Sequence, residues 1–261
     1  MSKRIFSVFA SVLLLFGCGG SSSSSSPPPP VTNMHVGGIW EGTVTVAGFG
    51  TLELLGLVAE DGRAHFIQED GTQYWGTVTA SGNQISANIT GAVPVGYVFQ
   101  DGSTSGTGTI TGTIAERSTI TASSTFTTTL GTVTNGTISM VFNPLYNRDS
   151  SLATVAGNYT NFFAPGSDAM NVSGTGVLFG QDPGTGCVIN GTVGIIDPAY
   201  NAYQLQYSYA SCTGGSSILN GSSFSGIATL DNTIAPEQAI AGVQGTVGAV
   251  LYSIIFWYER T

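Results

Sequence analysis

Apolar and polar residues alternate with a period of two over most of the chain from Gly38 onward. Side chains that alternate in this way lie on opposite faces of a β-strand, so the pattern predicts half-buried strands. Turn signals such as Asp61-Gly62, Asp70-Gly71 and Asp101-Gly102 separate the runs and are typical of tight hairpins. In the first half we expect strands at residues 39–47, 51–59, 63–69, 73–80, 84–91, 105–115, 117–128 and 133–143.

The two faces of these predicted strands differ in chemistry. The polar face is rich in threonine, and four glycines share the apolar face: Gly42, Gly56, Gly76 and Gly112. A sheet with one apolar face closes on itself or on a second sheet, and glycines on the inner face permit strong bending. The pattern therefore favours a barrel over a flat sandwich. The apolar face carries Trp40, Val44, Val46, Leu52, Leu54, Val58, Phe66, Tyr74, Val78, Ile85, Ile89, Ile110, Ile114, Ile120 and Phe126.

The second half of the chain repeats glycine-containing triplets of the first half in the same order. Such a repeat indicates two similar units, so we predict an all-β protein of two tandem antiparallel up-and-down barrels, at 37–148 and 149–261. The alternative is one large β-sandwich or barrel domain of about 220 residues. No long helix is expected; Asp149 is a candidate N-cap for one short helical turn at the junction. The triplets are Gly38-Ile39-Trp40, Gly76-Thr77-Val78, Gly112-Thr113-Ile114 and Gly136-Thr137-Ile138, beside Gly157-Asn158-Tyr159, Gly191-Thr192-Val193, Gly226-Ile227-Ala228 and Gly245-Thr246-Val247.

The N-terminus has the pattern of an export signal. Lys3-Arg4 precedes an apolar run from Ile5 to Phe16 that is too short to span a hydrocarbon core of about 30 Å. Leu15-Phe16-Gly17-Cys18 resembles the signal box of bacterial lipoproteins. The resemblance implies that residues 1–17 are removed and that Cys18 becomes the lipidated first residue; the alternative is an ordinary signal peptide with a chance cysteine. By the same resemblance, Gly19 after the cysteine implies that the protein is located at the outer membrane. The resemblance does not specify which leaflet carries the anchor.

Residues 18–36 have the composition of a tether. Gly19-Gly20 and the serines of 21–26 are typical of a flexible linker, and the prolines of 27–30 favour extended polyproline II. We therefore expect a spacer between the lipid anchor and the first barrel.

Charge excludes several partners. The full chain has 6 Lys and Arg residues against 15 Asp and Glu residues. Without residues 1–17, four arginines face fifteen acids, and the net charge is −11. Such a chain lacks the basic patch that nucleic acids need and is repelled by anionic lipid surfaces. Contact with the membrane is therefore expected through the N-terminal acyl chains, at about 0.8 kcal/mol per buried CH₂.

Cys187 and Cys212 are an even pair in a chain predicted to leave the cytoplasm, which favours a disulfide. The expected strands 187–197 and 202–212 flank a turn at 198–201, and the midpoint between the cysteines is 199.5. A hairpin without a bulge then places the two cysteines directly opposite each other. The alternatives are two free thiols or other pairings.

Each half opens with Gly-x-aromatic and closes with Tyr-x-Arg. This arrangement resembles the signature of calycins, the lipocalin-like barrels, in which a cation from the last strand lies over an aromatic ring of the first strand. The resemblance implies two contacts, Trp40 with Arg148 and Tyr159 with Arg260. Their expected role is a structural lock rather than a binding site.

The chain shows no catalytic constellation. His35 and His65 have no metal-ligand spacing, and neither a Gly-x-Ser-x-Gly motif nor a phosphate loop is present. We expect no enzyme activity, catalytic residue, metal or cofactor. The acidic turns at Glu69-Asp70 and Asp101 should share one barrel end and could ligate calcium, although acidic turns are more often chosen for backbone geometry. The aromatic row Tyr203, Leu205, Tyr207 and Tyr209 is more typical of core than of a ligand platform.

These features favour a lipid-anchored binding protein of the cell envelope. An eight-stranded barrel is just wide enough to be filled by side chains or to hold one small ligand. The barrels could therefore enclose a small apolar molecule or present loops to an envelope or host protein. The alternative is a structural or assembly lipoprotein of the outer membrane that exposes strand edges or threonine-rich faces.

Overall fold

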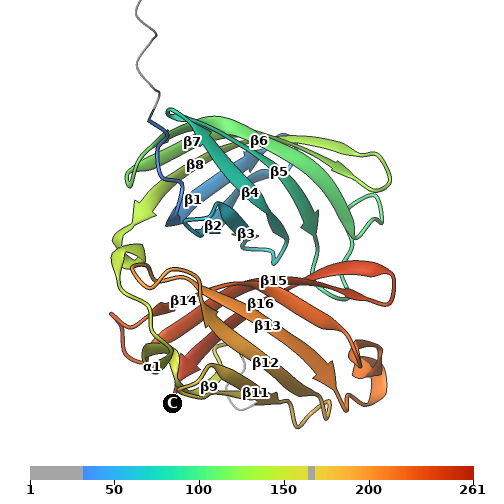
Figure 1. Cartoon of the computed structure of the whole chain (residues 1–261). Helices are drawn as coiled ribbons and strands as arrows, with labels where there is room; N and C mark the ends of the chain where they lie inside the picture. The colour runs from blue at the N-terminus through green and yellow to red at the C-terminus, as the bar shows by residue number, and fades with distance from the viewer. Residues whose placement is uncertain (1–31, 164–167) are drawn as a thin grey trace, which may run out of the picture. The chain divides into compact units, whose positions relative to one another are not determined.

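The first half of the chain forms a closed antiparallel barrel in a computed structural model that describes residues 32–163 and 168–261 (Figure 1). Consecutive strands pair, and β1 closes the barrel by pairing with β8. The predicted strand limits are correct to within two residues. The strands are β1 (Gly38–Val46), β2 (Gly50–Val58), β3 (Arg63–Gln68), β4 (Gln73–Ser81), β5 (Gln84–Ala92), β6 (Ser105–Ala115), β7 (Thr119–Thr128) and β8 (Val133–Asn143).

The second half forms another closed barrel of eight antiparallel strands, so the prediction of two tandem barrels is confirmed and the alternative of one large sandwich or barrel is wrong. Closure is completed by β16 on β9, with Arg260 opposite Tyr159. The strands are β9 (Gly157–Asn161), β10 (Ala169–Val172), β11 (Val177–Gln181), β12 (Val188–Ile195), β13 (Tyr203–Ala210), β14 (Ser223–Asp231), β15 (Gln238–Val247) and β16 (Val250–Arg260); a 3₁₀ turn, η2 (Gly214–Leu219), lies between β13 and β14.

The interior of the first barrel follows the predicted alternation. Trp40 is fully buried, and the expected apolar residues of β1 to β7 lie in the cluster around it or pack against it. Ile138 and Met140 of β8 complete the cluster. The inner glycines lie where neighbouring strands come close. A Cβ at Gly42 would be 2.0 Å from the Ser139 carbonyl oxygen, and one at Gly112 would be 2.2 Å from that of Thr121. Any larger residue there would force the strands apart, so glycine permits the tight closure.

The interior of the second barrel is filled by aromatic side chains. Tyr203, Leu205 and Tyr207 are buried, so this row is core, as predicted. The Tyr207 ring lies 5.4 Å from the Phe224 ring and 5.1 Å from the Phe256 ring, between ring centroids. Large rings in such contact occupy the volume that a ligand would need.

The junction contains two short helical segments, η1 (Pro144–Asn147) and α1 (Leu152–Val155). The prediction that Asp149 caps the helical turn is wrong. The hydroxyl of Ser151 accepts a hydrogen bond from the Thr154 backbone N–H at 3.0 Å, whereas Asp149 is exposed between the segments. An N-cap must reach the N–H two or three residues ahead, and Asp149 lies too early in the chain to do so.

The two barrels contact each other through a third apolar cluster, in which Ile67 of β3 and Ile227 of β14 are buried. The Tyr146 ring of η1 stacks on the Tyr200 ring of the β12–β13 turn, with centroids 5.0 Å apart. The Ser253 hydroxyl of β16 donates to the Ala92 carbonyl of β5 at 3.0 Å. Apolar burial and the Ser253 hydrogen bond stabilise this contact.

The predicted signal peptide, Cys18 and most of the tether lie outside the described residues. The last tether residues lie against the first barrel, where the Met34 backbone N–H donates to the Gly82 carbonyl at 2.9 Å. The Val36 carbonyl accepts the Trp40 indole N–H at 3.2 Å. Across residues 32–163 and 168–261, no helix has the length and apolar character needed to cross a membrane.

Candidate ligand-binding site

One end of the first barrel is hollow. Four connections meet there, joining β1 to β2, β3 to β4, β5 to β6 and β7 to β8. The empty space at this mouth is about 630 Å³, including the part open to solvent. The residues that line the mouth are Val46, Phe49, Leu52, Gln68, Asp70, Thr72, Tyr74, Phe99, Gln100, Asp101, Phe126, Thr128, Thr132 and Thr134.

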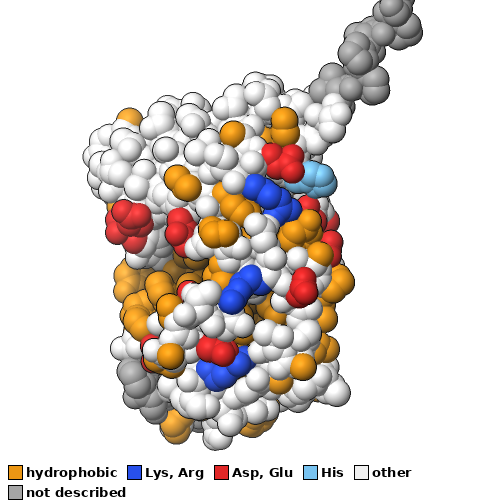
Figure 2. All heavy atoms as spheres, turned by 90° about the vertical axis from the view of Figure 1, so that its left-hand side faces the viewer, with side chains coloured by type: hydrophobic (Ala, Val, Ile, Leu, Met, Phe, Trp, Pro, Cys, Tyr) orange, Lys and Arg blue, Asp and Glu red, His pale blue; other side chains and the backbone are white. Residues whose placement is uncertain are grey.

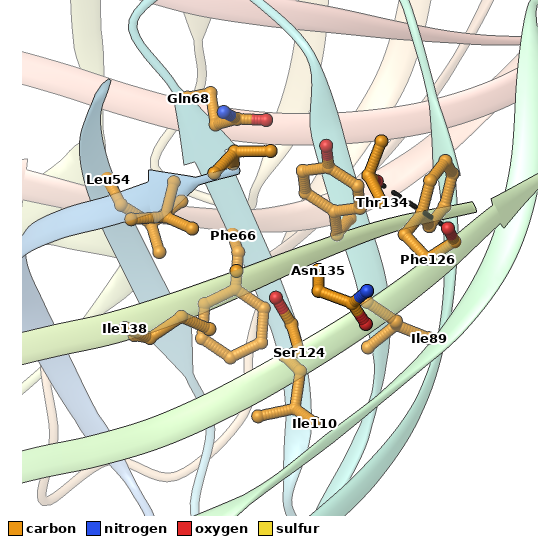
Figure 3. A pocket seen from close by; sticks show the side chains of 14 residues that line it. Leu54, Phe66, Gln68, Ile89, Ile110, Ser124, Phe126, Thr134, Asn135 and Ile138 are labelled. Carbon is orange, nitrogen blue, oxygen red and sulfur yellow. Dashed lines mark hydrogen bonds between the residues drawn. The ribbon is translucent and has the colours of Figure 1, made fainter. Parts of the chain in front are cut away.

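A second hollow lies deeper in the same barrel and shares Gln68, Tyr74 and Phe126 with the mouth. Its empty space is about 460 Å³, including the part open to solvent. Its walls are mainly apolar, and in Figure 3 Gln68 lies at the top, with Ile110 at the bottom. Because the two hollows share lining residues, they form one site, which we call the barrel-1 pocket. Apolar walls with a few polar side chains are typical of small-molecule sites.

Two polar side chains of the barrel-1 pocket, Gln68 and Tyr74, have no hydrogen-bond partner among the described residues. Gln68 is only 4% exposed, and neither its side-chain amide nor the Tyr74 hydroxyl hydrogen-bonds to any residue within 32–163 or 168–261. Burial, and then the nearby Asp70 carboxylate, raise the pKa of Tyr74 well above its usual value. The Tyr74 hydroxyl therefore stays protonated and is a neutral donor, while the Gln68 amide can donate or accept.

The acidic turns share this barrel end, as predicted, but their carboxylates serve the turns. Asp70 Oδ1 accepts from the Thr72 backbone N–H at 2.9 Å. Asp101 accepts from Ser103 N–H and Oγ at 2.9 and 2.6 Å and from the Thr128 hydroxyl, and these hydrogen bonds hold the pKa of Asp101 well below its usual range. No three His, Cys, Asp or Glu side chains of the described residues are grouped to hold a metal ion. The hydrogen bonds that these carboxylates accept within the turns account for the acidic residues without a calcium ion.

The charges around the barrel-1 pocket favour an uncharged ligand. Its lining residues include two carboxylates and no Lys, Arg or His. Elsewhere, cations pair with acids: Arg117 lies 3.6 Å from Glu60, and Arg260 lies 2.5 Å from Glu237. Figure 2 shows blue cations beside red acidic side chains on one face, while other red side chains, at the left of the view, lie apart from the cations on mostly uncharged surface. An anionic ligand would meet repulsion at this mouth and no compensating cation.

The expected lock residues behave differently in the two barrels. The Arg260 guanidinium lies 5.4 Å from the centre of the Tyr159 ring and donates to its hydroxyl at 2.9 Å, as expected. In the first barrel the expected contact of Trp40 with Arg148 is replaced. Phe142 packs against the edge of Trp40 with ring centroids 5.4 Å apart, and Arg148 is exposed.

Arg117 supplies the cation at that end of the first barrel. Its guanidinium lies 5.6 Å from the Phe142 ring centre and 5.0 Å from the Tyr200 ring centre, so it connects the two barrels. Sequence reasoning missed this role because Arg117 lies in the β6–β7 turn rather than in a closing Tyr-x-Arg. Arg117 has a left-handed φ of 51°, which changes the direction of the chain in this turn. The alternation of apolar and polar residues does not predict this change of direction.

Cys187 and Cys212 form the predicted disulfide, but the predicted register is wrong by one residue. Val188 lies opposite Ala210, so the regular ladder ends before both cysteines. Ser211 then adopts a left-handed φ of 59°, which turns the chain out of the ladder. The cysteines meet just beyond the paired strands, where the ladder no longer fixes which residues are opposite.

Neither histidine lines the barrel-1 pocket. His35 is exposed and lies 3.4 Å from a Glu60 carboxylate oxygen. His65 is buried on the outer side of β3, with its ring stacked on Trp75 at 6.0 Å between centroids. Neither belongs to a metal or nucleophile arrangement among the described residues. The chain matches no family model, no curated protein and no solved structure.

Proposed function

We propose that the protein is a lipid-anchored envelope protein that binds a small, uncharged, mainly apolar molecule in the barrel-1 pocket. The observation that carries this proposal is the hollow in the first barrel, where the Gln68 amide lies above apolar walls without a hydrogen-bond partner among the described residues. A ligand with one hydrogen-bonding group and an apolar body would pair with this amide and fill the hollow.

The lipid anchor is proposed from the Leu-Phe-Gly-Cys box, with Cys18 as the acylated residue and the outer membrane as the location. An anchored protein of net negative charge would remain at the envelope without binding anionic lipid through its surface. Assembly through free strand edges is less well supported, because the sixteen described strands are closed into two barrels.

Two adjacent serines provide a matched test of the barrel-1 pocket. Ser124 lines the pocket, whereas Ser123 is exposed on the opposite face of β7. We would titrate residues 19–261, without lipid or detergent, with the neutral fluorophore N-phenyl-1-naphthylamine. The Ser124→Leu variant fills the pocket and should weaken binding by about tenfold, whereas Ser123→Leu should bind like the parent.

The charge of the ligand is tested by displacement of the same fluorophore. 1-Decanol should displace it, and decanoate should compete at least about tenfold less well because its carboxylate meets Asp70 and Asp101 without a cation. Equal effects of the two serine variants would refute the pocket. Equal competition by the alcohol and the acid would refute the uncharged ligand while leaving the pocket in place.

A further inference from the structure

A second candidate site lies on the outer surface, away from the barrel-1 pocket. Two open hollows share Trp75 and Gly76, so they form one continuous depression, which we call the Trp75 groove. Their empty volumes are about 880 and 610 Å³, including space open to solvent. One arm crosses the outer face of β4 to β7, and the other reaches residues of β13, β14 and β15.

The first arm is a regular row of hydroxyl groups that begins at Trp75. Trp75 lies opposite Thr90, Thr90 opposite Thr107, and Thr107 opposite Thr127. Neighbouring strands are about 4.8 Å apart, which is close to the length that one hexose adds to an extended chain. The row therefore presents hydroxyl groups at intervals that suit successive sugar units.

The second arm is lined by amides. Gln204, Gln206 and Gln244 of the second barrel border the groove beside Trp75. The Gln244 amide already donates to the Ser225 hydroxyl at 3.4 Å. The amides of Gln204 and Gln206 each offer two donors and one acceptor oxygen, which matches ligands whose hydroxyl groups both donate and accept.

Trp75 is a fixed aromatic surface between the two arms. Its ring is only partly buried, and the His65 ring stacks against it with an angle of 18° between the planes. Burial lowers the pKa of His65 to about 4, so the imidazole behind the indole is neutral at neutral pH. A rigid indole loses little entropy when the apolar C–H face of a pyranose packs on it.

Charge narrows the class of ligand. Among the described residues that line the Trp75 groove, Arg63 alone is charged at neutral pH, and it pairs with Asp61 at 2.8 Å. The absence of carboxylates from this lining contrasts with the acidic composition of the chain. One paired cation is too little for a nucleic acid, and hydroxyl and amide walls do not suit an apolar molecule.

We propose that the Trp75 groove binds a neutral oligosaccharide, with one sugar stacked on Trp75 and its neighbours hydrogen-bonded along the threonine row and the glutamines. This inference is independent of the barrel-1 pocket. It assigns the acidic protein a second ligand class, recognised by uncharged polar groups.

The test is calorimetric titration of the full chain, extracted in a detergent without a sugar head group. The probes are cellotetraose, maltotetraose and tetra-N-acetylchitotetraose, with tetragalacturonate as the acidic counterpart. At least one neutral tetrasaccharide should bind, and more tightly than the acidic one. Trp75→Ala should weaken its binding by about tenfold, whereas Trp75→Phe should retain most of it because the aromatic face remains.

Tyr97→Ala is the matched control, because Tyr97 is an exposed aromatic residue that does not line the groove. It should bind the tetrasaccharide like the parent. Failure of all three neutral probes to bind would overturn the proposal. So would equal affinity of the parent and a folded Trp75→Ala variant, with folding checked by far-ultraviolet circular dichroism.

Discussion

At the scale of single residues, the two buried polar side chains of β3, His65 and Gln68, lie on opposite faces of the strand and have different surroundings. Gln68 points into the first barrel, where its amide lines the barrel-1 pocket without a partner among the described residues. His65 lies on the outer side of the same strand and is buried where the second barrel approaches. Alternation along β3 predicts the side on which each residue lies. It does not predict burial on the outer side, because that depends on contact with another barrel.

The burial of His65 makes stability depend on pH. In the folded protein its pKa is lowered from 6.5 to about 4, so between these values the unfolded chain binds a proton that the folded chain does not. The free energy of unfolding should therefore fall as pH decreases through this window. Between pH 7.5 and pH 5.0 the expected contribution is a loss of about 2 kcal/mol.

Urea unfolding of the parent and of His65→Gln at the two pH values measures this contribution. Carboxylates affect both proteins alike, so the difference between the two pH responses isolates His65. A parent and variant that lose the same stability on acidification would contradict the assigned burial.

At the scale of elements, the sequence predicts strands well and their register less well. Period-two alternation and Asp-Gly turns locate the strands of the first barrel to within two residues. Register errors arise where one residue leaves the regular backbone, as Ser211 does before Cys212. The helical turn lies at the predicted junction, but its N-cap is Ser151 rather than Asp149. Both residue types are good N-caps, and only their distance to Thr154 separates them.

The disulfide should stabilise the second barrel substantially. Cys187 and Cys212 are separated by 25 positions, and closing a loop of this length contributes about 3 kcal/mol in the chain-entropy model. The double variant Cys187→Ser with Cys212→Ser should lose that amount in urea unfolding at neutral pH.

Peptide mapping without reduction provides the control, because the parent should give a cross-linked peptide containing both cysteines. Recovery of two free thiols from the parent, or unchanged stability of the double variant, would show that the bond is absent or without effect.

At the scale of the whole molecule, two barrels of the same topology have different interiors. The second barrel is filled by Tyr203, Tyr207, Phe224 and Phe256, whereas the first keeps a hollow above Ile110. The apolar pattern predicts which side chains point inward in both. It does not predict the unfilled volume, because that is a small difference between the barrel's interior and the summed side chains. The barrel-1 pocket and the Trp75 groove therefore cannot be predicted from the sequence pattern and are found only in the folded structure.

The most direct test of the proposed function is native mass spectrometry of the full chain extracted from its own envelope. We expect the parent to carry an uncharged molecule that adds a discrete mass, and Ser123→Leu to carry the same molecule. The Ser124→Leu variant, whose barrel-1 pocket is filled, should lack it. A parent that carries no such molecule, or one that persists unchanged in Ser124→Leu, would contradict the account of the first barrel as a ligand-holding barrel.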